Sequence, residues 1–330
     1  MTGLVALTGA TGFLGQRLTP VLLARGWRVR ALARRVPQGP PPPGLDWIQG
    51  DLADAGALAE LARGAEAFVH LAGLIMARDL GAFLAANAQG AAAAAAAARG
   101  AGARLVHISS LAAREPHLSP YAASKRAGED AARAAFGAGA VILRPPAVYG
   151  PGDRATLGLF QLAARSPILP CPADPDARLA LIHADDAAAE IAEAVTAGGA
   201  LALDGGVFAL GGARPEGYGW SEIWSAALNA FSRRALVPPL PLSLIHAAGA
   251  LADLGVAFTG RPSLFGRGKA RELAHRDWSV APEEMAPWQG RGQGRGQGQG
   301  QGPGRNRVAA RPLDQGFAET ARWYAEQGWL

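Results

Sequence analysis

A strand that runs into a glycine-rich turn and then into a helix opens this chain. Residues 4–18 read LVALTGATGFLGQRL, and Gly9, Gly12 and Gly15 follow the apolar run in a Gly-x-x-Gly-x-x-Gly pattern. Glycine permits a tight turn and a close approach of backbone to pyrophosphate, and the free N–H groups of a helix N-terminus attract the negative charge. We therefore expect a dinucleotide site formed by Gly9, Thr11, Gly12, Phe13, Leu14 and Gly15.

The first half of the chain alternates short apolar runs with helical stretches. The apolar runs lie at 4–7, 28–32, 67–73, 103–109 and 140–145, and the helical stretches lie between them. This alternation predicts an α/β fold with a Rossmann-like, doubly wound parallel sheet. We place the nucleotide-binding domain at 1–150, with segments returning to it at about 180–210, and a smaller C-terminal substrate lobe at 151–330.

The positive charge is concentrated in one segment. The net charge is +5, and residues 288–311 contain five arginines and no acid, so the remainder is near neutral. Because the charge does not form a patterned face, no specific nucleic-acid partner is expected. Within this segment, residues 289–306 consist almost entirely of Gly, Gln and Arg, which predicts a disordered insert inside the second lobe.

The start of the chain resembles a strand rather than a signal peptide. The apolar stretch 235–258 is interrupted by prolines, His246 and Asp253, so we expect no transmembrane span. Cys171 is the single cysteine, which excludes an internal disulfide and fits a reducing cytoplasm. These features predict a cytoplasmic protein.

The end of the second strand indicates which cofactor is used. An acid there would bind the 2′-hydroxyl of NAD(H), but the position is Ala33, followed by Arg34 and Arg35. Arginine can hold a phosphate through charge-assisted contacts, which favours NADP(H), with NAD(H) as the alternative. The alternative without a function is that both arginines belong to a solvated loop.

Two further strand ends are candidates for cofactor contacts. After the third strand, Asp51 is expected to bind the adenine amino group and Leu52 to pack on the ring, although Asp51 or Asp54 also suits a helix cap. After the fourth strand, the small residues of the HLAG motif leave room for the cofactor. The contacts expected there are Leu71, Ala72 and Gly73, while His70 is interpreted as a packed strand residue.

Tyr121 and Lys125 are four positions apart in SPYAASKRAGE and therefore share a helical face. Taken alone, such a pair occurs in many helices. Its context is more specific, because the motifs TGATGFLG, GDL, HLAG, HISS, YAASK and LRPPAVYGPGD occur in this order. Over roughly residues 3–190 the chain resembles the extended short-chain dehydrogenase/reductase superfamily. The C-terminal part more loosely resembles the branch near 3-beta-hydroxysteroid dehydrogenases and dihydroflavonol reductases.

The resemblance implies a catalytic set of Ser110, Tyr121 and Lys125. Tyr121 would exchange a proton with a substrate oxygen, and Ser110 would bind the same oxygen, with Ser109 as the fallback. Lys125 would bind the nicotinamide ribose and, with the oxidised nicotinamide, lower the pKa of Tyr121 by roughly 3 units to about 7. The resemblance also suggests Asn87 as a relay or structural residue, Pro146 and Val148 beside the nicotinamide amide, and Tyr149 at the substrate entrance.

The expected activity is NAD(P)-dependent reduction of a ketone or aldehyde, or oxidation of the alcohol, on a small-molecule substrate. The segment SSLAARE lacks the acid that sugar dehydratases carry beside the serine, which disfavours dehydration. A nucleotide-sugar epimerase with tightly bound NAD remains an alternative, as does a non-catalytic NADPH-binding subunit resembling that of respiratory complex I.

Apolar residues after position 210 would suit a hydrophobic ketone or alcohol, although they also suit an ordinary core. In many relatives the helices corresponding to 87–100 and 121–135 form a dimer contact, so a homodimer is possible. His183, Asp185 and Asp186 are interpreted as a helix start, and no metal site is expected.

Overall fold

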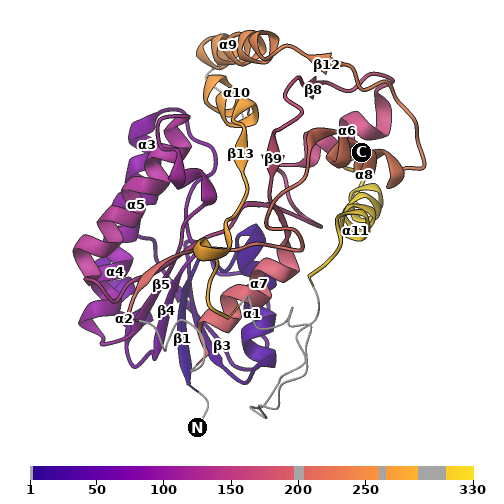
Figure 1. Ribbon diagram of the computed structural model, residues 1–330. Coiled ribbons are helices and arrows are strands. Elements are labelled where there is room, and N and C mark those ends of the chain that lie inside the picture. Colours follow the sequence, from indigo (N-terminus) through magenta and orange to yellow (C-terminus); the bar gives the residue numbers. More distant parts are fainter. Residues whose placement is uncertain (1–2, 197–203, 260–264, 289–309) are drawn as a thin grey trace.

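A seven-stranded, fully parallel sheet forms the larger part of the molecule (Figure 1). The computed structural model describes residues 3–196, 204–259, 265–288 and 310–330. The strand order is β11 (Gly206–Ala209), β6 (Val141–Arg144), β5 (Arg104–Ile108), β4 (Ala67–His70), β1 (Leu4–Thr8), β2 (Arg28–Ala33) and β3 (Leu45–Gln49). The order reverses beside β1, so the carboxyl ends of β1 and β4 flank the crevice where such sheets bind ligands. The predicted Rossmann-like fold is confirmed.

Helices cover both faces of this sheet. On one face α1 (Phe13–Ala24) packs with α7 (Ala184–Ala194), and on the other α2 (Ala55–Ala62), α4 (Gly90–Gly100) and α5 (Pro120–Phe136) lie together (Figure 1). The alanine run of α4 has three residues with no exposed surface, Ala94, Ala95 and Ala98. Small side chains at these positions allow α4 to lie close to both the sheet and α5.

A π-helical turn, η1 (Ala85–Gln89), joins α3 (Leu80–Leu84) to α4, so that helical backbone continues from 80 to 100. This stretch is long and apolar enough, by length and composition, to cross a membrane, and 33% of its most apolar window is buried. In the structure it packs along α5.

The second lobe is built from helices and short strand pairs. Its helices are α6 (Leu157–Arg165), α8 (Trp220–Asn229), α9 (Leu242–Thr259), α10 (Arg267–Ala274) and α11 (Leu313–Glu326). The strand pairs are β7 (Ala147–Tyr149) with β10 (Leu181–His183), β8 (Cys171–Pro172) with β12 (Pro239–Leu240), and β9 (Arg178–Leu179) with β13 (Asp277–Trp278). An aromatic core that includes Phe160, Trp224, Phe317 and Tyr324 holds these elements together.

The chain crosses between the two parts more than once. After β10, α7 returns to pack on α1, and β11 completes the sheet beside β6. The division near residue 150 stays a prediction. The insert predicted at 289–306 lies outside the described residues.

Candidate active site

The glycine-rich turn is shaped by contacts that only glycine permits. Gly9 has a φ of +79°, and a Cβ atom there would lie 2.7 Å from the amide nitrogen of Ala72. A Cβ on Gly15 would collide with the Gly9 carbonyl oxygen. Helix α1 starts after Gly12 without a side-chain cap, so its first N–H groups are not occupied by a capping side chain. The turn therefore fits a pyrophosphate.

Thr8, at the end of β1, joins the two strand ends beside this turn. Its Oγ1 accepts hydrogen bonds from the amides of Leu71 (3.2 Å) and Ala72 (3.3 Å), and it lies 2.8 Å from Nδ1 of His70. Leu71 and Ala72 are partly buried, and Gly73 is exposed. The predicted HLAG segment is thus brought against the glycine-rich turn.

The residues that follow β2 and β3 include exposed arginines and two aspartates, one of which caps α2. Arg34 and Arg35 are exposed directly after the buried Ala33. Asp54 caps α2 by accepting a 2.9 Å hydrogen bond from Ala57, which settles the cap in its favour. Asp51 is exposed, and its Oδ1 accepts a 2.8 Å hydrogen bond from the amide of Ala53.

Leu52 and Asn87 connect the carboxyl-terminal edge of the sheet to helices α4 and α5. Leu52 packs against Gly90 at the start of α4. Asn87 is 2% exposed: its Oδ1 accepts a 2.7 Å bond from the amide of Leu74, and its Nδ2 donates to the Leu74 carbonyl (3.0 Å) and to Oγ of Ser124 (2.8 Å). Asn87 therefore holds the loop after β4 against α5. The π-helical turn η1 places the Asn87 side chain between the loop and this helix.

Lys125 is anchored at the sheet edge. Its Nζ donates a 2.8 Å hydrogen bond to the carbonyl oxygen of Ile108, the last residue of β5. Burial lowers the pKa of Lys125 to about 8, against the opposing effect of the Glu129 carboxylate. The ammonium thus sits at the end of β5, immediately before the two serines.

Ser110 lies close enough to Tyr121 for its hydroxyl to favour the phenolate. Burial raises the pKa of Tyr121 to about 12, the Ser110 side chain lowers it, and the Glu272 carboxylate raises it. The chain by itself therefore moves this pKa away from 7, opposite to the expected shift. That expectation relied on two positive charges; in the structure desolvation of the phenolate is the largest cause of the shift, and the Lys125 ammonium is not among its causes.

The two neighbouring serines have different surroundings. Ser109 is buried and donates a 2.6 Å hydrogen bond to Glu129, whose carboxylate also accepts two bonds from Arg144 (2.7 and 2.6 Å). Ser110 begins the short helix η2 (Leu111–Arg114) and accepts a bond from Ala112. Ser109 is thus committed to a buried network, and Ser110 is the serine beside Tyr121.

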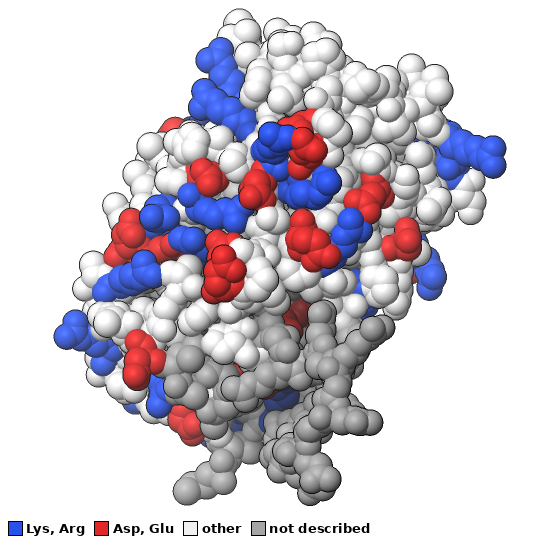
Figure 2. All heavy atoms as spheres, in the orientation of Figure 1, with Lys and Arg blue, Asp and Glu red and all other residues white. Residues whose placement is uncertain are grey.

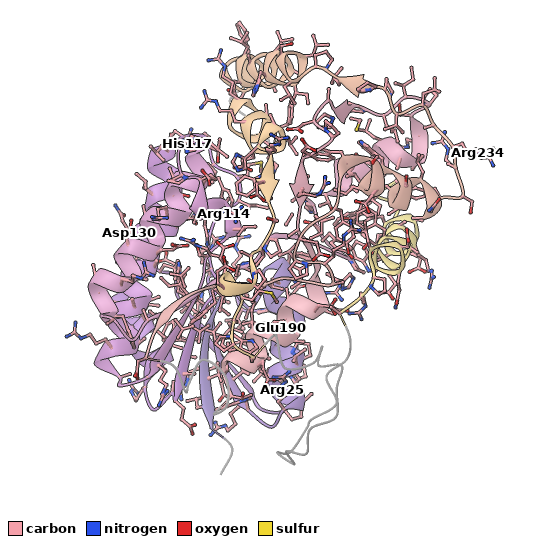
Figure 3. The ribbon with its side chains drawn as sticks, viewed as in Figure 1. Arg25, Arg114, His117, Asp130, Glu190 and Arg234 are labelled. Carbon is pink, nitrogen blue, oxygen red and sulfur yellow. The ribbon has the colours of Figure 1, made fainter. Side chains whose placement is uncertain are left out.

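The second lobe contacts the start of the tyrosine helix through residues that the sequence analysis missed. Ser119 caps α5 and donates a hydrogen bond to Glu272 of α10, which is 8% exposed. Arg114, labelled in Figure 3, extends toward β13 and donates to the carbonyl oxygens of Ser279 (2.9 Å) and Asp277. A capping motif marks Ser119 in the sequence, whereas Glu272 carries no local signal.

The segment after β6 differs in part from expectation. The amide of Leu111 donates a 2.8 Å bond to the carbonyl of Pro145, which ties the RPPAVYG segment to the serine edge. Pro146 is buried and Val148 partly buried. Tyr149 is only 2% exposed and packs edge-on against His183 and Phe317, so it does not line an entrance.

Two histidines are stacked under the site. The rings of His70 and His107, on adjacent strands, have centroids 5.2 Å apart and an interplanar angle of 15°, and each residue is 1% exposed. Burial lowers the pKa of His70 to about 3 and that of His107 well below 6.5, and the Lys125 charge acts in the same direction. Both are therefore neutral packed residues at neutral pH, as predicted for His70. His183 caps α7, and no metal-binding cluster occurs among the described residues.

The model of the NAD dependent epimerase/dehydratase family matches residues 5–203. The chain belongs to this family. Among family members, the chain is 48% identical to a ceramide reductase of Caulobacter vibrioides, over 99% of this chain and 96% of that protein.

Further relatives within the epimerase/dehydratase family match less of the chain. A 2-alkyl-3-oxoalkanoate reductase of Stenotrophomonas maltophilia is 31% identical over 56% of this chain and 62% of its own length. Among solved structures, Bordetella bronchiseptica WbmH in complex with NAD+ aligns over 99% of both chains with a TM-score of 0.70 and 18% identity, which shows the shared fold. The chain is an enzyme of the extended short-chain dehydrogenase/reductase type that uses a nicotinamide cofactor.

Proposed function

We propose that this enzyme reduces a carbonyl group on a long-chain lipid of the ceramide class, with NADPH as the preferred reductant. The observation that carries the proposal is the 48% identity to a ceramide reductase over nearly the full length of both chains. Because the match includes the second lobe, it extends to the part of the molecule that would bind the substrate.

The proposed chemistry uses three side chains. When bound, the nicotinamide supplies the hydride to the carbonyl carbon. Tyr121 donates its phenolic proton to the carbonyl oxygen, and the Ser110 hydroxyl donates a hydrogen bond to the same oxygen. A protonated tyrosine is the form required for reduction, and a pKa of about 12 keeps Tyr121 protonated at neutral pH.

Lys125 is proposed to hold the nicotinamide ribose from the end of β5. Its lowered pKa of about 8 leaves it mostly protonated at pH 7, so it can serve as a hydrogen-bond donor and a positive charge. Asn87 acts as a positioning residue, because it fixes the loop after β4 at Leu74 beside Gly73. Gly73 itself leaves space that a Cβ would fill, 2.9 Å from Oδ1 of Asn87.

The remaining cofactor contacts follow from the crevice. The turn from Gly9 to Gly15 is proposed to bind the pyrophosphate. Asp51 and Leu52 would contact the adenine, and Pro146 with Val148 would lie beside the nicotinamide amide. Arg34 and Arg35 are proposed to bind the 2′-phosphate of NADPH, since both are exposed at the end of β2 where no acid is present.

Apolar surface on the second lobe supports a lipid substrate. A hollow of about 610 Å³ lies between α6 and Phe265, two residues before α10, and is lined by Gly158, Gln161, Leu162, Arg165, Ser166 and Phe265. Tyr121 is not among these residues, so the hollow is proposed to take a hydrocarbon chain and not the carbonyl. A volume of this size is typical of small-molecule sites.

The test is a comparison of three substrates under one assay of NADPH oxidation. We expect turnover of a long-chain keto-ceramide, slower turnover of a short-chain ketone with the same polar head, and none of a UDP-sugar. Turnover of the UDP-sugar without net cofactor oxidation would instead identify an epimerase. The variant Tyr121→Phe is the control that ties any measured activity to this site.

A further inference from the structure

Helix α9 exposes an apolar stripe that nothing in the described part of the chain covers. Leu244, Leu251 and Phe258 are seven positions apart and are 53%, 68% and 90% exposed, and Leu254 is 52% exposed on the adjacent side. The exposed alanines Ala247 and Ala248 lie on the same face. Exposed contiguous apolar surface of this kind marks a membrane or protein contact.

The opposite face of α9 packs against α10 and its N-terminal end. Ile245 is 8% exposed, Gly249 packs against Ala270 of α10, and Asp253 accepts a hydrogen bond from the amide of Arg267. The helix is thus fixed by one face on α10 and leaves the other to solvent.

Positive side chains lie beside this stripe. Helix α10 carries three exposed cations, Arg267, Lys269 and Arg271. Arg267 forms an ion pair with Asp253 of α9, and Lys269 forms one with Glu272 of α10, whose carboxylate also accepts the Ser119 hydrogen bond from α5. Figure 2 shows the upper end of the molecule, where Figure 1 places α9, as largely uncharged surface with basic side chains at its edge. An apolar helical face with flanking Lys and Arg is the pattern of a helix that lies on an anionic lipid surface.

The stripe is also close to the proposed catalytic residues. Helix α10, on which α9 rests, contacts the start of α5 through Gly268 against Ser119 and through the Ser119–Glu272 hydrogen bond. Tyr121 follows Ser119 by two positions. One helix therefore separates the exposed face from the tyrosine.

We propose that the exposed face of α9 docks on an anionic lipid bilayer and places the active-site mouth at the membrane surface. This inference rests on the proposed lipid substrate, because a lipid in a bilayer must reach Tyr121 without crossing water. It concerns a helix lying on the surface and not one spanning it.

The experiment is co-flotation of the full chain with vesicles of phosphatidylcholine containing phosphatidylglycerol, compared with phosphatidylcholine alone. We expect wild-type protein to float with the anionic vesicles and to be released by high salt. Leu251→Asp should weaken this binding by about tenfold or more, because it places a charge in the apolar face that the bilayer would bury. The matched control is His246→Asp, which adds a charge to the same helix at an exposed position off the stripe and should bind nearly as wild type.

Flotation does not depend on turnover, so the proposal and the proposed function can fail separately. Failure of wild type to float, or equal binding by Leu251→Asp and wild type, would overturn the membrane proposal. If the vesicles do not bind and Leu251→Asp converts a dimer to a monomer, the face is a contact between copies instead. Thermal unfolding and turnover of a short-chain ketone should match wild type in both variants, because Leu251 and His246 are exposed.

Discussion

Nζ of Lys125 donates a 2.8 Å hydrogen bond to the carbonyl oxygen of Ile108. This bond joins α5 to the last residue of β5, and the next two residues are the serines of the site. The helix that carries Tyr121 and the strand end that carries Ser110 are therefore held in register by one buried ammonium.

Tyr121→Phe should reduce turnover by about 10²- to 10⁴-fold, because it removes the proton donor and little volume. Cofactor affinity, measured by fluorescence titration with NADPH, should change little. Tyr218→Phe, a substitution of the same kind in the second lobe, is the control and should keep turnover. Near-complete activity in Tyr121→Phe would contradict the assignment.

The neighbouring serines should separate catalysis from stability. Ser110→Ala should lower turnover at least tenfold with a small change in thermal unfolding, since it removes a hydrogen-bond donor beside Tyr121. Ser109→Ala should keep most turnover but cost about 1–3 kcal/mol of unfolding free energy, because it takes one donor from the buried Glu129 carboxylate. The reverse pattern would make Ser109 the substrate serine.

Glu272→Gln should shift the pH profile of reduction. The Glu272 carboxylate raises the pKa of Tyr121, so removal of its charge lowers that pKa and the protonated tyrosine is lost at a lower pH. The alkaline limb of turnover should therefore move toward neutral pH, while glutamine retains an acceptor for Ser119. Glu283→Gln, at an exposed position of the same lobe, should leave the limb in place.

His70→Gln should make the protein less sensitive to acid. The pKa of His70 is about 3 in the folded chain against 6.5 for the ordinary side chain, so below pH 6.5 the unfolded chain binds the extra proton. Wild-type stability then falls as the pH drops from about 6.5 toward 3, by at most about 1.4 kcal/mol per pH unit for this group. Urea unfolding between pH 7 and 5 should show a shallower decline in the variant. An unchanged slope would mean that His70 titrates normally.

Replacement of both Arg34 and Arg35 by Ala should weaken NADPH binding and leave NADH binding almost unchanged. Exposed charge-assisted contacts to a phosphate are worth about 1.5–3 kcal/mol each, so a loss of tenfold or more in affinity is expected. Titration of both cofactors checks the difference. Equal effects on the two would show that the arginines belong to a solvated loop.

Local patterns predicted the parts of the site that neighbouring residues determine. Gly9 could be predicted because a turn with positive φ between a strand and a helix selects glycine. The pairing of Tyr121 with Lys125 followed from helical spacing, and the parallel sheet from the alternation of apolar runs. In each case the information lies within a few residues of sequence.

Features that depend on distant residues could not be predicted in this way. Glu272 approaches Tyr121 from a helix about 150 positions away, and no motif near either residue signals that contact. The direction of the Tyr121 pKa shift depends on burial, which sequence spacing does not report. Tyr149 was expected at an entrance, but the return of α11 buries it.

The aromatic core of the second lobe has a consequence for how the protein is made. Phe160 of α6 packs against Phe317 (5.0 Å between ring centroids) and Tyr324 (5.3 Å) of α11, and Phe317 follows it by 157 residues. At ribosomal rates of 5–20 residues per second, roughly 8 to 30 s separate the synthesis of the two halves. The Rossmann sheet can pair most of its strands during that interval, but α6 must wait with its apolar face uncovered. Nascent chains of this protein therefore expose this face of α6 until α11 has been synthesised.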